Sequence, residues 1–157
     1  MKHAQRPAHP FGLGVPHQRK RALYAAFGAA FATGILWLIF HYFLYRQGEF
    51  GAEPHPLEQW WLRLHGACAF AMLWFAGLVW GTHARPALAQ PRWRVSGLTI
   101  MGSIALLAAT GYVLYYAGDD AWRDVARLLH WIVGLLFAVP LLIHIVGVRR
   151  ARRQRLR

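Results

Sequence analysis

Four long apolar stretches constrain the fold of this 157-residue chain more than any other feature of its sequence. A helix needs about 20 residues to cross the hydrocarbon core of a bilayer, and each stretch has that length. Hydrophobic residues make up 57% of the chain, which is more than a soluble domain of this size usually carries. The sequence therefore predicts an all-α integral membrane protein, a four-helix bundle with short loops. Its spans are expected at Ala22–Tyr45, Trp60–Thr82, Val95–Tyr116 and Val125–Val148.

The charged residues divide between the two ends of the predicted helices. Of the 18 Lys and Arg, 14 lie in residues 1–21, 85–94 and 149–157, whereas all six acids lie in the two loops at the other end. This asymmetry is the positive-inside pattern, which predicts that the N and C termini are both cytoplasmic. We expect a basic cytoplasmic tail over 1–21, a transmembrane domain over 22–148 and a second basic tail over 149–157.

The net charge of +12 is therefore concentrated beside the expected membrane. Basic segments in that position attract anionic lipid headgroups. The expected partner of this charge is membrane lipid, and nucleic-acid binding is not expected.

Four histidines occupy matched depths in the second and fourth stretches. His65 and His83 are 18 residues apart, and His130 and His144 are 14 apart. These spacings correspond to about five and about four helical turns, so the two histidines of each helix share a face. Because both helices run from the outside to the inside, we expect His65 to pair with His130 near the outer face, and His83 with His144 near the inner face. The difference of four residues, about 6 Å of helix rise, requires tilted helices or slanted pairs.

Paired imidazoles in an apolar setting are typical of the axial ligands of haem iron. Zinc usually takes four ligands, often with Cys or carboxylate among them, and proton relays usually include Asp or Glu. No acid lies inside the predicted spans, and the single cysteine, Cys68, is interpreted as a small apolar residue. The chain has no C-x-x-C-H motif for covalent attachment. The histidine pairs therefore predict two non-covalent haem b groups, with His17 and His41 as alternative ligands at the inner and outer sites.

Each expected outer ligand has a glycine and an arginine within about one helical turn. A glycine leaves room for a flat macrocycle against the helix, and an arginine can pair with a haem propionate or extend to the membrane interface. At the inner site, Arg85 and Arg149 have the corresponding positions. The candidates at the outer site are Gly66 and Arg63 beside His65, and Gly134 and Arg127 beside His130.

Three further features complete the expected site. Pro140 lies four residues before His144 and should bend the fourth helix. The third stretch has no histidine and is interpreted as a structural spacer. Aromatic residues at the outer interface could border a quinone site, but an aromatic belt is the preferred interpretation. These residues are Trp60, Trp61, Tyr115 and Tyr116.

The chain resembles the bacterial membrane-bound di-haem cytochromes b of the cytochrome b-561 type. The resemblance rests on the four-helix plan, a third helix without ligands, and a final helix LLHWIVGLLFAVPLLIHI that carries His130 and His144. It covers Ala22 to Val148, and LHGACAFAMLWFAGLVWGTHARP and TGYVLYYAGDDAW are similar to small uncharacterised members of that group. It implies a multi-pass protein of the bacterial cytoplasmic (inner) membrane. In those cytochromes some ligands come from the first helix, where this chain has only His41.

These patterns together lead to an expected function of transmembrane electron transfer. Two bis-histidine haems would connect a quinol or cytoplasmic donor with a periplasmic acceptor, either as a free cytochrome or as a subunit of an oxidoreductase. The alternative is a cofactor-free subunit that anchors or assembles a larger membrane complex. Its histidines would then form interhelical hydrogen bonds.

Overall fold

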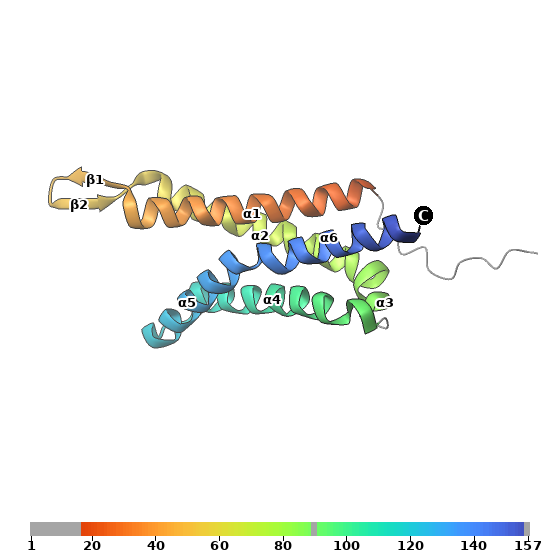
Figure 1. Ribbon diagram of the computed structural model, residues 1–157. Helices are drawn as coiled ribbons and strands as arrows, with labels where there is room; N and C mark the ends of the chain where they lie inside the picture. The colour runs from red at the N-terminus through yellow and green to blue at the C-terminus, as the bar shows by residue number, and fades with distance from the viewer. Residues whose placement is uncertain (1–16, 89–90, 156–157) are drawn as a thin grey trace, which may run out of the picture.

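The computed structural model describes residues 17–88 and 91–155, which form a bundle of long helices (Figure 1). Four segments are long and apolar enough to cross a membrane, namely Gln18–Phe43, Pro56–Val79, Arg94–Tyr116 and Asp120–Ala151. Their ends differ from the four predicted spans by five residues or fewer, so the prediction of four long apolar helices at these positions is confirmed. The helices are α1 (His17–Phe43), α2 (Pro56–Val79), α4 (Pro91–Tyr116), α5 (Asp120–Leu136) and α6 (Ala138–Arg155).

The all-α prediction needs one correction, in the loop after the first helix. Strands β1 (Tyr45–Gly48) and β2 (Gly51–Pro54) pair antiparallel there, with Tyr45 opposite Pro54. Gly51 has a φ of 119°, a conformation that favours glycine and closes the two-residue turn. An ion pair of 3.2 Å joins Arg46 to Glu53 across the strands. In Figure 1 this β-hairpin projects beyond the ends of α1 and α2, at the end of the molecule away from the C terminus.

The helices extend into both predicted tails. Helix α1 begins at His17, inside the segment 1–21 that we expected to be irregular, and residues 1–16 lie outside the described part. At the other end of the chain, α6 continues through the basic residues to Arg155. The basic residues just before the predicted first span and just after the predicted last span therefore do not end these helices.

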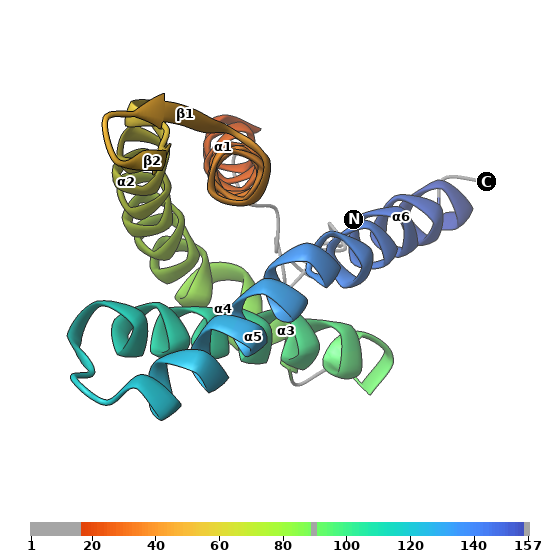
Figure 2. The same ribbon diagram turned by 90° about the vertical axis from the view of Figure 1, so that its left-hand side faces the viewer.

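The fold consists of two halves. Helix α1 packs along α2, and α4 packs against α5 and α6 (Figure 2). The halves meet in a small core, in which the rings of Phe27 and Phe137 stack with centroids 5.4 Å apart. Most other large apolar side chains face outward, as expected for helices whose surroundings are lipid. The buried core residues are Ala26, Phe27, Met72, Ile104 and Phe137.

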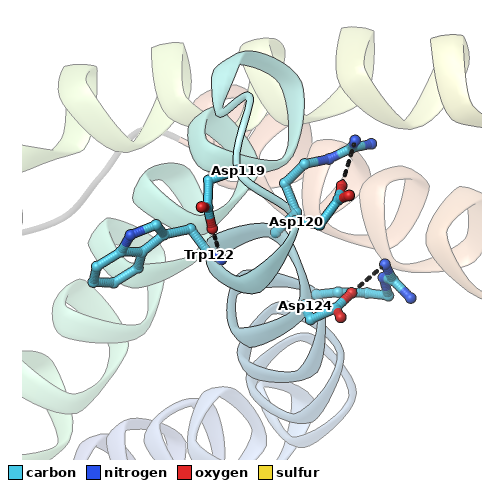
Figure 3. A network of polar contacts seen from close by, with 6 residues as sticks. Asp119, Asp120, Trp122 and Asp124 are labelled. Atoms are coloured by element: carbon cyan, nitrogen blue, oxygen red, sulfur yellow. Dashed lines mark hydrogen bonds and ion pairs between the residues drawn. The ribbon is translucent and has the colours of Figure 1, made fainter.

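Polar contacts fix the start of α5, at the same end of the bundle as the β-hairpin. The Asp119 carboxylate accepts a hydrogen bond of 3.1 Å from the Trp122 backbone N–H, which makes Asp119 the N-cap (Figure 3). Ion pairs join Asp120 to Arg123 and Asp124 to Arg127, over 3.5 Å and 2.6 Å. These carboxylates lie where the positive end of the helix dipole favours negative charge.

Two interruptions shape the helices that carry the histidines. The fourth span divides at Phe137, because Pro140 has no N–H to donate to the Leu136 carbonyl. The bend predicted at Pro140 is therefore confirmed. The second span ends in a π-helical turn, η1 (Trp80–Ala84), which contains His83 and is followed by the short helix α3 (Arg85–Leu88).

Candidate functional site

The structure brings His65 of α2 close to His130 of α5. The two ring centroids are 6.0 Å apart and the ring planes are nearly perpendicular, at 84°. The residues come from opposite halves of the fold, so this contact joins the halves. We call it the β-side pair, because both residues lie toward the end of the bundle that carries the β-hairpin.

A second pair lies toward the two termini. His83 of η1 and His144 of α6 have ring centroids 6.2 Å apart and ring planes at 81°. We call these two residues the termini-side pair. Both pairs therefore combine one histidine of the first half with one histidine of the second half, in the combination that the sequence predicted.

The two interruptions explain how unequal spacings give two similar pairs. A π-helical turn is wider than an α-helical turn and advances less along the axis per residue. The turn at Trp80–Ala84 thus shortens the path from His65 to His83, while the break at Phe137 lets α6 take its own direction. Both local changes lie between the histidines of one span, where the mismatch of four residues has to be accommodated.

The separation of the rings suits a metal ion between them. An imidazole centroid lies about 1 Å from its nitrogens, and a metal–imidazole bond is about 2 Å long, so two imidazoles on opposite sides of one ion have centroids about 6 Å apart. Both pairs have this separation. Within residues 17–88 and 91–155, no group of three or more His, Cys, Asp or Glu residues is placed to hold a metal ion.

Hydrogen bonds fix the ring orientation of His65. Its Nδ1 lies 2.9 Å from the Ala30 carbonyl oxygen and 3.4 Å from Thr33 Oγ1, both on α1. A carbonyl can only accept, so Nδ1 carries the proton and Nε2 keeps a lone pair. Metal-bound histidines typically have this arrangement, in which the second ring nitrogen donates to a carbonyl or carboxylate.

His130 has matching partners on α4. Its Nδ1 lies 2.9 Å from Thr110 Oγ1, and that hydroxyl donates its own proton to the Leu106 carbonyl over 2.8 Å. Its Nδ1 is therefore protonated as well, and Nε2 has the lone pair. In the termini-side pair, His144 Nδ1 lies 3.0 Å from Ser96 Oγ, again on α4. The third span, which we interpreted as a spacer, thus contacts one histidine of each pair.

The β-side pair borders an apolar cavity of about 100 Å³ between the halves. Gly134 lies in its wall, as do Phe27, Met72 and Phe137 of the core. A hollow of about 380 Å³ lies beside His144 of the termini-side pair. Its lining consists of Val95, Ser96, Thr99, Pro140, Ile143, His144 and Gly147.

The other predicted site residues have more varied surroundings. A side chain at Gly66 would approach the Tyr115 hydroxyl rather than either histidine. Arg63 lies over the Trp60 ring, 5.3 Å from its centroid, and Arg127 pairs with Asp124. Both arginines therefore contact neighbours on their own helix. Arg85 and Arg149 are exposed near the termini-side pair.

The alternative ligands do not join either described pair. His41 Nδ1 lies 2.7 Å from a Glu58 carboxylate oxygen, and its ring stacks on Trp37. Glu58 is buried, with 8% of its surface exposed, so this contact ties the end of α1 to the start of α2. His17 begins α1, and its side chain lies outside the described part of the structure.

One buried polar group near the β-side pair lacks a partner. Trp61 Nε1 is inaccessible and has no hydrogen-bond partner among the residues that the structure describes. Trp61 lies four residues before His65, hence on the same face of α2. A buried N–H without an acceptor is costly, so this indole is suited to donate to a group that binds beside it. We did not predict this role, since eight Trp occur in the chain and an interfacial belt explains them in general.

No protein-family model, curated protein or solved structure matches this chain.

Proposed function

We propose that the chain is a di-haem b-type cytochrome that transfers electrons across the bacterial cytoplasmic membrane. The proposal rests on the two histidine pairs, whose ring centroids are 6.0 Å and 6.2 Å apart. In each pair the two imidazoles come from opposite halves of the fold. His65 and His130 would hold one haem, and His83 and His144 the other. A haem brings four equatorial nitrogens of its own, so two imidazoles complete its iron coordination.

The residues around the β-side pair fit such a group. Both Nδ1 atoms are engaged with neighbouring helices, which leaves both Nε2 lone pairs as ligands. Gly134 in the cavity wall leaves room for a flat ring system. The Trp61 N–H is a suitable donor to a propionate, and Arg63 and Arg127 lie near enough in sequence to exchange their present contacts for one.

A haem with two histidine ligands accepts and releases one electron and has no open position for oxygen. The chain's own residues would fix where this happens. The histidines set two sites near opposite ends of the bundle, and most of the side chains around the β-side cavity are apolar. Burial and the hydrogen bonds of the axial ligands then tune the reduction potential.

The charge pattern supports an orientation for this conduit. Basic residues at the termini end would face the cytoplasm, and the acidic β-hairpin end the periplasm. We propose a quinol or a cytoplasmic redox protein as donor, a periplasmic redox protein as acceptor, and anionic lipid around the basic ends. A quinone would meet the exposed aromatic side chains at the β-hairpin end, among them Trp60, Tyr115 and Tyr116.

One observation favours the alternative of a cofactor-free anchor or assembly subunit. His65 and His130 already form hydrogen bonds to a neighbouring helix, as structural histidines in a membrane do. However, those bonds use only Nδ1 and lie within each half. They do not explain why the four rings meet in pairs between the halves.

Visible spectra of the purified protein, oxidised and dithionite-reduced, test the proposal when haem is counted as the pyridine haemochrome. We expect about two haems b per chain in the unchanged protein, and about one in His130→Ala and in His144→Ala, because each variant loses one axial ligand. His41→Ala is the matched control, since His41 contacts Glu58, and it should keep both haems. A folded protein without pigment would exclude the cytochrome and favour the anchor.

A further inference from the structure

We propose that two Thr–Gly pairs, Thr33–Gly34 on α1 and Thr110–Gly111 on α4, are equivalent positioning elements for the axial ligands at the β-side pair. The inference rests on the proposed function and extends it to residues that do not contact the metal. Each pair would fix the rotation and the tautomer of one histidine, so that Nε2 is the ligand atom.

The two elements have the same sequence in corresponding places. Residues 32–34 and residues 109–111 both read Ala-Thr-Gly, one in the first span and one in the third. Each faces a histidine on the helix that follows it in the chain, His65 or His130. At His65, the carbonyl three residues before the threonine, that of Ala30, also accepts a hydrogen bond from the imidazole. A threonine–histidine contact that is repeated in both halves points to a common role.

The threonine hydroxyls can only accept from the histidines. Thr110 Oγ1 lies 2.8 Å from the Leu106 carbonyl, and Thr33 Oγ1 lies 2.7 Å from the Ala29 carbonyl. Each hydroxyl proton is donated to that carbonyl, which leaves an oxygen lone pair to face the imidazole N–H. The threonine therefore holds the histidine in the Nδ1-protonated form.

The two threonines differ in how much they contribute. Thr110 Oγ1 is 2.9 Å from His130 Nδ1, a normal hydrogen bond, whereas Thr33 Oγ1 is 3.4 Å from His65 Nδ1. His65 is held mainly by the Ala30 carbonyl, at 2.9 Å. Replacing Thr110 should therefore affect the site more than replacing Thr33.

The glycines let the imidazoles approach the helix backbone. A Cβ at Gly34 would lie 3.1 Å from His65 Cε1, so the ring would have to shift. A Cβ at Gly111 would lie 3.6 Å from His130 Cε1, an ordinary contact. Gly28, also on α1, has nothing described within 4 Å of its Cβ position. Gly34→Ala should thus disturb the site more than Gly111→Ala, while Gly28→Ala should leave it unchanged.

The test compares haem affinity and midpoint potential in detergent-purified Thr110→Val, Thr110→Ser, Thr33→Val, Gly34→Ala and Gly28→Ala. Valine keeps the shape of threonine but cannot accept a hydrogen bond. Loss of a hydrogen bond to a metal-bound histidine typically lowers affinity 10- to 100-fold. We expect such a loss of affinity for one of the two haems in Thr110→Val. The reduction potential of that haem should shift to more positive values, because an imidazole whose N–H has lost its hydrogen-bond acceptor donates less electron density to ferric iron.

Comparison of Thr110→Ser with Thr110→Val distinguishes the loss of a hydrogen-bond acceptor from a change in packing. Thr110→Ser restores the acceptor and should restore affinity and potential, although it removes a methyl group. Thr33→Val should show a smaller change in the same direction. The inference is overturned if Thr110→Val binds haem with unchanged affinity and potential, or if Thr110→Ser is as impaired as Thr110→Val. If the unchanged protein contains no haem, the proposed function fails instead, so the two failures are distinguishable.

Discussion

At the residue scale, the β-side histidines are oriented by their neighbours and not by each other. Each ring donates Nδ1–H to the adjacent helix of its own half, and the two rings meet between the halves with nearly perpendicular planes. A ligand whose rotation is already fixed loses little freedom when it binds a metal. The same hydrogen bonds therefore stabilise each half and prepare the site between them.

Trp61 provides a residue-scale prediction. Trp61→Phe removes the buried N–H but keeps an aromatic side chain of similar bulk. If this N–H donates to a propionate, its loss should weaken the β-side haem by about tenfold, the effect of losing one hydrogen bond to a charged group. Haem titration into the stripped protein measures this affinity.

Trp60→Phe is the matched control for that titration. Trp60 is the preceding residue, is 58% exposed and lies under Arg63, so its indole should not reach the site. Equal affinities of the two variants would contradict a role for Trp61 in haem binding.

At the element scale, the interruptions of the helices place the termini-side pair. The π-helical turn carries His83, and α6 begins just after the break at Phe137 and carries His144. Such turns cost backbone hydrogen bonds and are frequent at functional sites. The pair thus depends on irregular backbone, whereas the β-side pair lies on regular helices.

Pro140→Ala should act on one pair only. Alanine supplies the missing N–H, so α5 and α6 can join into one straighter helix and His144 moves away from His83. The expected result is about one haem per chain instead of two, lost from the termini-side pair. The pyridine haemochrome count of the purified variant measures it.

The remaining haem in that variant should have the spectrum and potential of the β-side haem. Its pair lies before the break, at His65 and His130. A Pro140→Ala protein that retains both haems with unchanged potentials would show that the break does not determine the position of His144.

The sequence allowed the spans, the bend at Pro140 and the grouping of the four histidines to be predicted. Hydrophobicity defines the spans, and helical spacing decides which side chains share a face. Thr33 and Thr110 were missed because a threonine in an apolar helix usually donates its hydroxyl proton to the backbone of its own helix. Their contacts with the histidines form only when the helices pack. The contact of His41 with Glu58 was missed for a similar reason, as the two residues are joined only when α1 and α2 pack. The β-hairpin was not predicted, because the prolines and charged residues of this segment suggested an open loop.

At the scale of the whole molecule, two halves share a small core. Phe27 and Phe137 stack between them, with Met72 and Ile104 beside the rings. Lipid is as apolar as these side chains, so their association depends on close packing and on polar contacts rather than on escape from water. The histidine pairs lie on either side of this core along α2 and along α5–α6, so bound haem would add contacts where the halves otherwise touch little.

The orientation of the molecule can be tested by labelling single cysteines in a Cys68→Ala background. Phe50, at the tip of the β-hairpin, is 97% exposed, and Gln154 is exposed near the end of α6. We expect Phe50→Cys to react with a membrane-impermeant maleimide in intact spheroplasts. Gln154→Cys should react only after lysis, because the proposed orientation puts the basic ends of the helices in the cytoplasm. The reverse pattern of labelling would invert the proposed direction of the conduit.

The repeated Ala-Thr-Gly segments have a consequence for the origin of this fold. Each half contains a helix with this segment, a following helix with the histidine it orients, and a second histidine 18 or 14 residues further along the chain. Two copies of a chain of half this length could therefore build the β-side pair by dimerising around a twofold axis. Duplication and fusion of such an ancestral gene would leave two related halves free to diverge. The different spacings of their histidines and the different strengths of their threonine contacts are the differences that such divergence would produce.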